Sequence, residues 1–332
     1  MNTKRAFTLV EILTVIVIIS ILAGLTVLAV AGAMRASKRA KISWEMNGIA
    51  MALEQYKNEF GEYPPDMFDM EAFVRHVEKR WPRLDWTKVN AGTPPPTTLT
   101  TLQKARLIQN AINQTYQAYD SRVDFTQSNA PLGALALWLG GFPNTDGKLS
   151  GFLADPENPF FTADLPANRV YDQKVFLDLG LDGDKGKRVR IYKPTNSNTP
   201  IPVIGNEIRD VFVPLVYFRA QSGGGVFAYR PDVQFVTDYQ GTDVTDSAYD
   251  WCFPYADTIE RNTGGKIIGG KWKNPTTYQL IHPGLDGKFG KRTDKDALKS
   301  VRVIKTGANV GAEDLDNIMN FSDYKELKSI LP

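Results

Sequence analysis

Residues 1–33, MNTKRAFTLVEILTVIVIISILAGLTVLAVAGA, decide how this chain is built. The part from Ile12 to Ala33 is 22 residues long and contains no charged side chain. A helix rises about 1.5 Å per residue, so about 20 apolar residues cross the hydrocarbon core of a bilayer. A helix that is apolar on every side needs an apolar environment all round. The stretch therefore predicts a membrane-inserted helix at the start of the chain.

A secretory signal peptide is the first interpretation of this stretch. Lys4 and Arg5 would form its basic start, and Ala29-Val30-Ala31 or Ala31-Gly32-Ala33 its small-residue cleavage site. The apolar run, however, is longer than the ~7–15 residues of a signal core. A plain membrane anchor is the second interpretation. It gives no purpose to Glu11, since a carboxylate at the membrane edge is costly unless it is paired.

The third interpretation accounts for both the basic start and the acidic residue. The segment MNTKRAFTLVEILTVIVIISILAG resembles the leader and first helix of the type IV pilin and type II secretion pseudopilin family. The resemblance implies that a prepilin peptidase cuts between Ala6 and Phe7, and that the new terminus at Phe7 is N-methylated. Most members of the family have Gly before the cut, where this chain has the similarly small Ala6.

Glu11 has a physical role in this interpretation. Cleavage before Phe7 creates an α-amino group, which is positive near neutral pH. Both charges lose water in a membrane or in a filament core, so each is tolerable there only as a member of a pair. The resemblance implies that the pair joins neighbouring subunits, so that Glu11 would set their axial register.

The basic residues on either side of the apolar run give conflicting orientations. Four of them follow the run, and two precede it in the leader: Arg35, Lys38, Arg39, Lys41, Lys4 and Arg5. The positive-inside rule alone would place the C-terminal side in the cytoplasm. The resemblance implies a single pass through the inner (cytoplasmic) membrane, with the head in the periplasm or outside the cell. We follow the resemblance, because the processing motif is the more specific signal.

An apolar stripe continues beyond the membrane run. Its members step by four or three residues: Ile42, Met46, Ile49, Leu53, Tyr56 and Phe60. This spacing forms one face of an amphipathic helix. We therefore expect one helix from about Thr8 to Phe60, ended by Gly61 and the pair Pro64-Pro65. The phrase ALEQYKNEFGEYPPD, Ala52 to Asp66, again resembles pseudopilins.

The rest of the chain predicts an α+β head packed on this helix, as in pilins. Short helices are expected around residues 70–77, 99–119 and 132–139, the second with Leu102 on its apolar side. Short runs rich in branched and aromatic residues predict strands at 170–179, 188–192, 211–219, 226–229, 278–282 and 301–304. The expected segments are 1–6 (leader), 7–33 (membrane and assembly half of the helix), 34–60 (amphipathic half), 61–150 (helical insertion) and 151–332 (β-rich head).

Calcium is the one cofactor that the sequence suggests. GLDGDKGKR at 180–188 is echoed by GLDGKFGKR at 284–292, and each copy on its own reads as a tight turn. Residues 274–290 with the later segment 313–321 resemble the C-terminal end of major pseudopilins, where a loop and an acidic segment bind calcium. The resemblance implies Asp286, Asp314 and Asp316 as ligands, which suits the oxygen preference of Ca²⁺. Asp178, Asp182 and Asp184 at the first copy are weaker candidates.

Composition excludes several classes of function. The 332 residues carry 39 basic and 37 acidic side chains, which balance at 37 each once the leader is removed, so no nucleic-acid partner is expected. Cys252 is alone, which excludes an intrachain disulfide. His76 and His282 are far apart, and no nucleophile elbow or phosphate-cradling loop is present. The alternating aromatic residues at 249–255 are read as core rather than as a binding stripe.

The sequence thus predicts a structural subunit and not an enzyme. Its partners would be the prepilin peptidase, the inner membrane and other pilin or pseudopilin subunits. The rival hypothesis is an envelope enzyme or binding protein, anchored in the membrane or exported by a signal peptide, in which the head is the working part. Replacing Glu11 by Ala separates the two, because it should block assembly and leave the activity of a tethered head intact.

Overall fold

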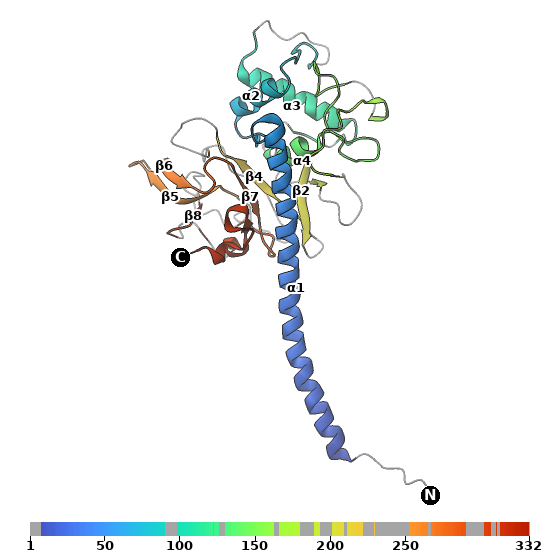
Figure 1. Ribbon diagram of the computed structural model, residues 1–332, viewed down its shortest axis with the longest axis vertical. Coiled ribbons are helices and arrows are strands. Elements are labelled where there is room, and N and C mark those ends of the chain that lie inside the picture. Colours follow the sequence, from blue (N-terminus) through green and yellow to red (C-terminus); the bar gives the residue numbers. More distant parts are fainter. Residues whose placement is uncertain are drawn as a thin grey trace.

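The longest element of the protein is a single helix, α1 (Leu9–Phe60), shown in the computed structural model of Figure 1. Thr8 caps its first turn, and Gly61 ends it in the left-handed conformation with a φ of 76°. Only glycine adopts that conformation without a steric penalty from Cβ, so it is a natural stop. The predicted helix from Thr8 to Phe60 is confirmed. The structure describes residues 8–89, 98–121, 123–125, 130–162, 166–179, 189–192, 201–208, 211–221, 229, 252–264, 267–289, 302–306, 310 and 313–331.

Three shorter helices follow α1 in the chain: α2 (Met70–Arg80), α3 (Thr101–Gln117) and α4 (Ala130–Gly140). Asp69 caps α2, and Thr100 forms a capping box with Gln103 at the start of α3. The helices α2 and α3 pack together at the end of the molecule farthest from the N-terminus (Figure 1). The helix α4 instead lies beside α1 and packs against two of the strands. The three expected helices are therefore present.

Nine short strands lie in the described part of the chain: β1 (Val189–Tyr192), β2 (Ile201–Ile208), β3 (Val211–Pro214), β4 (Val216–Arg219), β5 (Tyr255–Arg261), β6 (Ile267–Trp272), β7 (Tyr278–His282), β8 (Arg302–Val303) and β9 (Ile318–Met319). They form three sheets of three strands, in the orders β1-β2-β3, β4-β7-β9 and β6-β5-β8. Among these described strands, only β5 and β8 pair in parallel. The helix α4 packs on β2 and β4, so it covers two of these sheets. The α+β class is confirmed.

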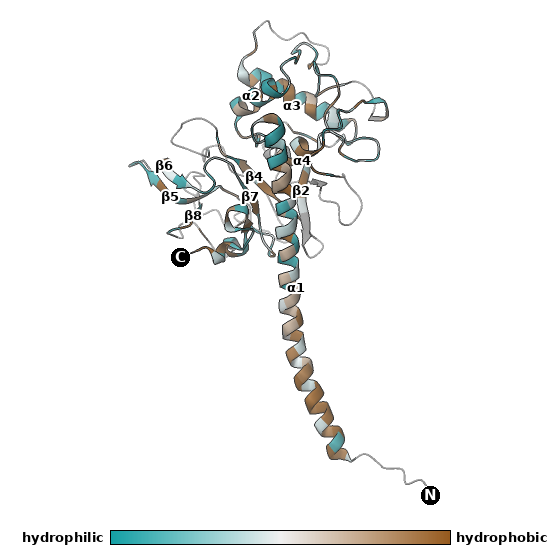
Figure 2. Ribbon diagram, viewed as in Figure 1, coloured by the Kyte–Doolittle hydropathy of each residue, from teal (hydrophilic) through white to brown (hydrophobic). Residues whose placement is uncertain are grey.

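The head encloses only the second half of α1. The predicted stripe from Ile42 to Tyr56 is buried there, with every member at most 3% exposed. Trp138 of α4 packs edge-on against Tyr56 in the same core. Figure 2 shows the first half of α1 as a brown, apolar rod that projects from the head. The core therefore begins where the amphipathic stripe begins, and the hydrophobic cluster continues across residue 150 into the strands.

Several local predictions differ from the structure. Leu102 is 50% exposed, because the buried face of α3 passes through Ala105, Ile108 and Ile112 instead. The run at 170–179 forms a single bridge from Tyr171 to Leu153 and no strand. The run at 211–219 is broken at residue 215 into two strands of different sheets. The residues at 226–228 lie outside the described part of the chain.

Candidate functional site

The start of α1 is held by a reciprocal cap. The Thr8 backbone N–H and hydroxyl each donate to Oε2 of Glu11 over 2.8 Å, and the Glu11 backbone N–H donates back to Oγ1 of Thr8 over 3.3 Å. This arrangement satisfies backbone donors that the first turn of a helix leaves without partners. Ala6 and Phe7 lie outside the described residues, immediately before this cap. The cap was missed in the sequence, although its Thr-x-x-Glu spacing is visible there.

Glu11 is therefore used within its own chain. One carboxylate oxygen binds Thr8, which becomes the second residue of the mature chain if cleavage falls before Phe7. The favourable position of a negative charge at a helix N-terminus adds to this cap. The carboxylate thus sits within one turn of the expected new amino terminus, where it can still meet a positive charge. Charge and capping are two separable properties of the same side chain.

The apolar half of α1 is unusual because the protein itself does not cover it. The head buries none of its most apolar 18 residues. The hydroxyl groups in this half bond back to their own helix: Thr14 to the Val10 carbonyl and Ser20 to the Ile16 carbonyl, each over 2.7 Å. Such back-bonding gives each hydroxyl group a hydrogen-bond partner, so that it is not left unsatisfied in lipid. The helix has the length and composition to cross a membrane.

The junction between this apolar half and the head is closed by the C-terminal segment. Arg39 of α1 forms an ion pair with Glu326, and the Ser43 hydroxyl donates to the Tyr324 carbonyl over 2.7 Å. Glu326 itself is bridged to Ile318 of β9. The C-terminal segment therefore meets the middle of α1 at the foot of the head. These contacts fix the direction in which the apolar half leaves the head.

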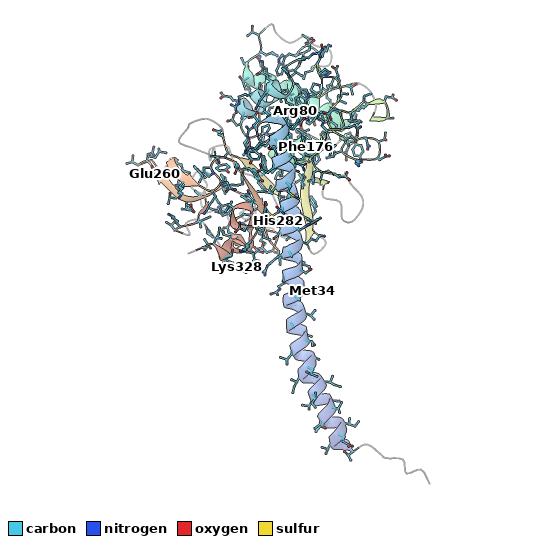
Figure 3. All side chains as sticks on the ribbon, viewed as in Figure 1. Met34, Arg80, Phe176, Glu260, His282 and Lys328 are labelled. Carbon is cyan, nitrogen blue, oxygen red and sulfur yellow. The ribbon has the colours of Figure 1, made fainter. Side chains whose placement is uncertain are left out.

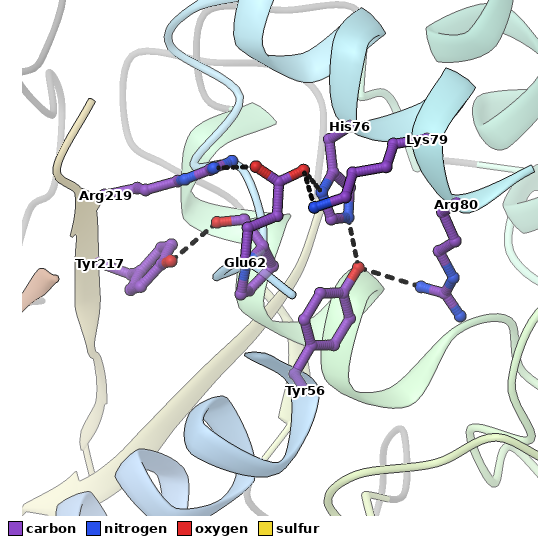
Figure 4. Close-up of polar contacts among 8 residues, drawn as sticks. Tyr56, Glu62, His76, Lys79, Arg80, Tyr217 and Arg219 are labelled. Carbon is purple, nitrogen blue, oxygen red and sulfur yellow. Dashed lines mark hydrogen bonds and ion pairs between the residues drawn. The ribbon is translucent and has the colours of Figure 1, made fainter. Parts of the chain in front are cut away.

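A buried hydrogen-bonded chain holds the other end of α1 (Figure 4). Arg80 donates to the Tyr56 oxygen over 3.1 Å, and the Tyr56 hydroxyl lies 2.6 Å from Nε2 of His76. Nδ1 of His76 lies 2.9 Å from one oxygen of Glu62, and Arg219 donates to the other over 2.6 Å. The groups come from α1, from the loop after it, from α2 and from β4. The chain thus ties three parts of the head to the last turns of the long helix.

The protonation states follow from burial. Burial lowers the pKa of His76 to about 4 against the opposing charge of Glu62, so the imidazole is neutral near neutral pH. Burial alone would raise the pKa of Glu62, but its bonds to His76 and Arg219 lower it to about 2. Burial raises the pKa of Tyr56 to about 12. A neutral His76 that donates from Nδ1 to Glu62 and accepts at Nε2 from Tyr56 matches every contact in this hydrogen-bonded network.

Tyr56, His76 and Glu62 have the residue types of an acid–base relay, yet their setting is structural. Tyr56 is 0% exposed and His76 is 1% exposed, so a substrate in solvent cannot reach either group. Trp138 contacts both rings, and Arg80 lies over the Phe60 ring at 4.2 Å. Aromatic packing thus fills the surroundings of the relay. The arrangement is suited to locking α1 into the head.

The acidic loop predicted to bind calcium is assembled only in part. Oδ2 of Asp316 accepts from the backbone N–H groups of Leu285 and Asp286, over 2.8 and 3.1 Å. Oδ1 of Asp316 is buried with no hydrogen-bond partner within the described residues. Burial, helped by the negative charge of Asp316, raises the pKa of Asp286 to about 7. A cation bound between the carboxylates of Asp286 and Asp316 would relieve their repulsion. It would also give Oδ1 of Asp316 a partner, which it lacks among the described residues.

Asp314 lies apart from this pair. Its carboxylate oxygen is 3.1 Å from Nε of Arg302, and the Tyr255 hydroxyl donates to it over 3.4 Å. Both members of the ion pair are at most 1% exposed. Asp178 forms an ion pair with Lys148 at the surface, while residues 182 and 184 lie outside the described part. Among the described residues no group of three or more His, Cys, Asp or Glu side chains is placed to hold a metal ion.

The remaining candidates from the sequence are buried. Cys252 is 2% exposed, and burial raises the pKa of its thiol well above the ordinary range, which makes it unreactive. In the aromatic run, Phe253 and Tyr255 are each 1% exposed, as expected of core residues. Residues 249–251 lie outside the described part of the chain.

Comparison with known proteins supports the assignment of the N-terminus. Residues 1–27 match the family model of the prokaryotic N-terminal methylation motif. No curated protein and no solved structure matches the chain. The matched residues contain the expected cleavage point, the cap of Thr8 and Glu11, and most of the apolar run. The first 27 residues of the chain therefore carry the leader motif of type IV pilins and pseudopilins, the kind of leader that a prepilin peptidase processes.

Proposed function

We propose that the mature chain is a structural subunit that assembles through α1 into a type II secretion pseudopilus or a type IV pilus-like filament. The observation that carries the proposal is the apolar half of α1, which the head leaves 0% buried. An apolar surface of this length is stable only in a membrane or against other apolar helices. A subunit that passes from the membrane into a filament uses both environments in turn.

The helix α1, which we call the stem, is joined to the head in a way that suits such a subunit. The stem is one uninterrupted helix, locked at its far end by the Tyr56–His76 contact and at the foot of the head by the Arg39–Glu326 pair. Heads carried on rigid, identical stems repeat at a constant angle when the stems stack. A repeated contact of this kind generates a helical filament.

Glu11 supplies the register in this proposal. The amino group created at Phe7 would be positive, and the carboxylate of a neighbouring copy is the natural partner within an apolar bundle. The intrachain cap to Thr8 orients that carboxylate at the start of the helix. The N-terminus would be methylated at Phe7, and the head would lie in the periplasm or outside the cell, with no catalytic role.

We further propose that calcium binds at the loop of Asp286 and Asp316. The support is Oδ1 of Asp316, which has no hydrogen-bond partner in the described part of the chain and lies beside a second carboxylate. These two side chains, with carbonyl groups of the same loop, offer the oxygen ligands that Ca²⁺ prefers. A cation there would link the loop after β7 to the segment before β9. It would stabilise the part of the head that also holds Glu326.

Three variants test the assembly proposal, because they separate the charge of Glu11 from its cap. Glu11→Gln keeps a side-chain oxygen for the Thr8 cap and removes the charge. Thr8→Val removes the cap hydroxyl and keeps the charge. Glu11→Ala removes both. Each is expressed with the prepilin peptidase and the assembly machinery, and filaments are counted by electron microscopy and by crosslinking through cysteines introduced at the surface of the head.

We expect Glu11→Gln and Glu11→Ala to abolish filaments, while Thr8→Val still assembles. Mass spectrometry of the membrane-bound chain should show a mature protein that begins at Phe7 and is heavier by one methyl group. A Glu11→Ala protein that assembles as well as the wild type would exclude the register role of Glu11, and a wild-type chain that forms no filaments would exclude the filament role. A mature chain that begins near Gly32 or Met34 would instead identify an exported soluble protein.

A further inference from the structure

A group of basic side chains surrounds α1 where it leaves the apolar run. No acidic residue lies between Glu11 and Glu45, whereas four basic residues occupy two turns of the helix: Arg35, Lys38, Arg39 and Lys41. The orientation rule for membrane helices does not explain them, since they lie on the side of the membrane opposite to the cytoplasm in a pilin-like subunit. Their position calls for another role.

These side chains are open to a partner. Arg35 and Lys38 are exposed, and neither forms an ion pair with the described residues. The side chain of Lys41 is 69% exposed, and its Nζ is 3.9 Å from Glu45, at the limit of an ion pair. Arg39 alone is neutralised, by Glu326. Three cations on the stem therefore face solvent.

The C-terminal segment adds to the same surface. The bond from Glu326 to Arg39 brings this segment against the stem, and it carries the exposed Lys325 and Lys328. Figure 3 shows Lys328 on the rim of the head close to the level of Met34, just past the apolar run. We call this surface the basic foot: Arg35, Lys38, Arg39, Lys41, Lys325 and Lys328. Three acidic residues accompany these six, namely Glu45, Asp323 and Glu326, which leaves a net charge of +3.

The basic foot lies at the height of lipid headgroups. The uncharged run of 22 residues is about 33 Å long at 1.5 Å per residue, close to the hydrocarbon thickness of about 30 Å. The next turn then occupies the headgroup layer, which is about 5–8 Å deep on each side. The long basic side chains of the turn after it can reach back to that layer.

We propose that the basic foot binds the headgroups of anionic phospholipids in the membrane that α1 spans. Phosphate oxygens satisfy guanidinium and ammonium donors, and each cation near an anionic surface changes the bound-to-free ratio by about five-fold. The contact holds the head down on the bilayer and the stem upright until the subunit is extracted. This inference rests on the membrane-anchoring part of the proposed function.

The test measures the distance from the head to the bilayer. The full-length chain is placed in nanodiscs of phosphatidylcholine, with or without 30% phosphatidylglycerol, and Ser329→Cys carries a donor dye. Ser329 is exposed beside Lys328, and the native Cys252 is buried, so labelling is confined to the new thiol. Energy transfer to an acceptor on the lipid headgroups reports how close the rim lies to the membrane.

We expect higher transfer in the anionic discs, and a loss of that difference in 1 M NaCl, where the Debye length is about 3 Å. Arg35→Gln with Lys38→Gln should lower the docked-to-undocked ratio by about 25-fold. Arg83→Gln with Arg106→Gln removes the same charge from exposed sites after α2 and on α3, far from the foot, and should change nothing.

Transfer that is equal in both lipids, or that falls equally in both double variants, would overturn the inference while leaving the anchoring intact. A lipid-independent crosslink between two copies through residues 35–41 would likewise overturn it, in favour of a second copy as partner. A chain that does not enter the discs at all would remove the anchoring itself, and the inference with it.

Discussion

The Nε2 atom of His76 lies 2.6 Å from the hydroxyl oxygen of Tyr56, and this contact joins α2 to the last turns of α1. Arg80 donates to the same oxygen from 3.1 Å. The hydroxyl therefore has a partner on each side inside an aromatic core. Because no water reaches these groups, the loss of one hydroxyl would leave buried polar atoms without hydrogen bonds.

Replacing Tyr56 by Phe tests the lock between stem and head. The variant keeps the ring and removes only the hydroxyl, so Nε2 of His76 loses its donor. We expect the free energy of unfolding to fall by about 1–3 kcal/mol, measured by urea denaturation of the detergent-solubilised chain. Tyr171→Phe is the matched control, because its hydroxyl binds the Pro143 carbonyl in a half-buried position. Equal losses of unfolding free energy in the two variants would show that the bond between Tyr56 and His76 stabilises the head no more than a half-buried hydrogen bond does.

The stability of the head should depend on pH through His76. Its pKa falls from an ordinary 6.5 to about 4 on folding, because burial disfavours the imidazolium. The unfolded chain therefore binds more protons between these two values, and the free energy of unfolding decreases as the pH falls from about 6.5 to about 4. At 1.36 kcal/mol per pKa unit, the effect approaches about 3 kcal/mol.

Comparison with His76→Gln isolates this contribution. His282, whose pKa is lowered to about 3 by burial, acts in the same direction and is present in both proteins. Asp286 acts in the opposite direction and also cancels in the difference. Urea denaturation at a series of pH values should therefore give a smaller acid-induced loss for the variant between pH 6.5 and 4. Parallel curves for the two proteins would contradict the assigned protonation of His76.

The buried pair of Arg302 and Asp314 should behave as a unit. Removing either partner leaves a charge that is at most 1% exposed, so Arg302→Met or Asp314→Leu should each cost about 3–5 kcal/mol. The double variant should cost less than the sum, because no charge is then left alone. Equilibrium unfolding of the four proteins gives the coupling energy. Additive losses would mean that the two side chains stabilise the head independently.

Calcium should stabilise the head through Asp316. If the ion binds the loop, adding it at 100 times its dissociation constant raises the free energy of unfolding by about 2.7 kcal/mol. We expect Asp316→Asn to remove this response, measured as a shift in the thermal midpoint against EDTA. Asp178→Asn is the control, since that side chain is 81% exposed and bound to Lys148. A response that survives in Asp316→Asn would place the ion elsewhere.

Local signals predicted the elements that depend on neighbouring residues. The stripe of α1 repeats at three and four residues, and Gly61 with Pro64 ends it, so its bounds could be stated in advance. The sheets were harder to predict. The strand β6, Ile267–Trp272, contains two glycines, and β5 is largely polar. They become strands because they pair with each other, which no local pattern encodes.

The candidate site is likewise predicted in part from local sequence and in part only from the tertiary structure. Glu11 and its Thr8 partner are three residues apart, so both the motif and the cap belong to the sequence. Asp314 and Asp316 are neighbours in the chain and were grouped together, but the structure turns Asp314 toward Arg302 and Asp316 toward the loop of Asp286. The contact of Tyr56 with His76 follows no motif, and only the packing of α2 against α1 creates it.

The sequence by itself determined that this protein has a processed leader, a long apolar helix and an amphipathic continuation, because each follows from the order and spacing of adjacent residues. The tertiary structure decided how much of that helix the head covers, which carboxylates meet, and where Arg39 and Glu326 close the foot of the head. These features depend on residues tens to hundreds of positions apart, brought together when the core buries its apolar surface. Local periodicity holds no information on such distant pairs.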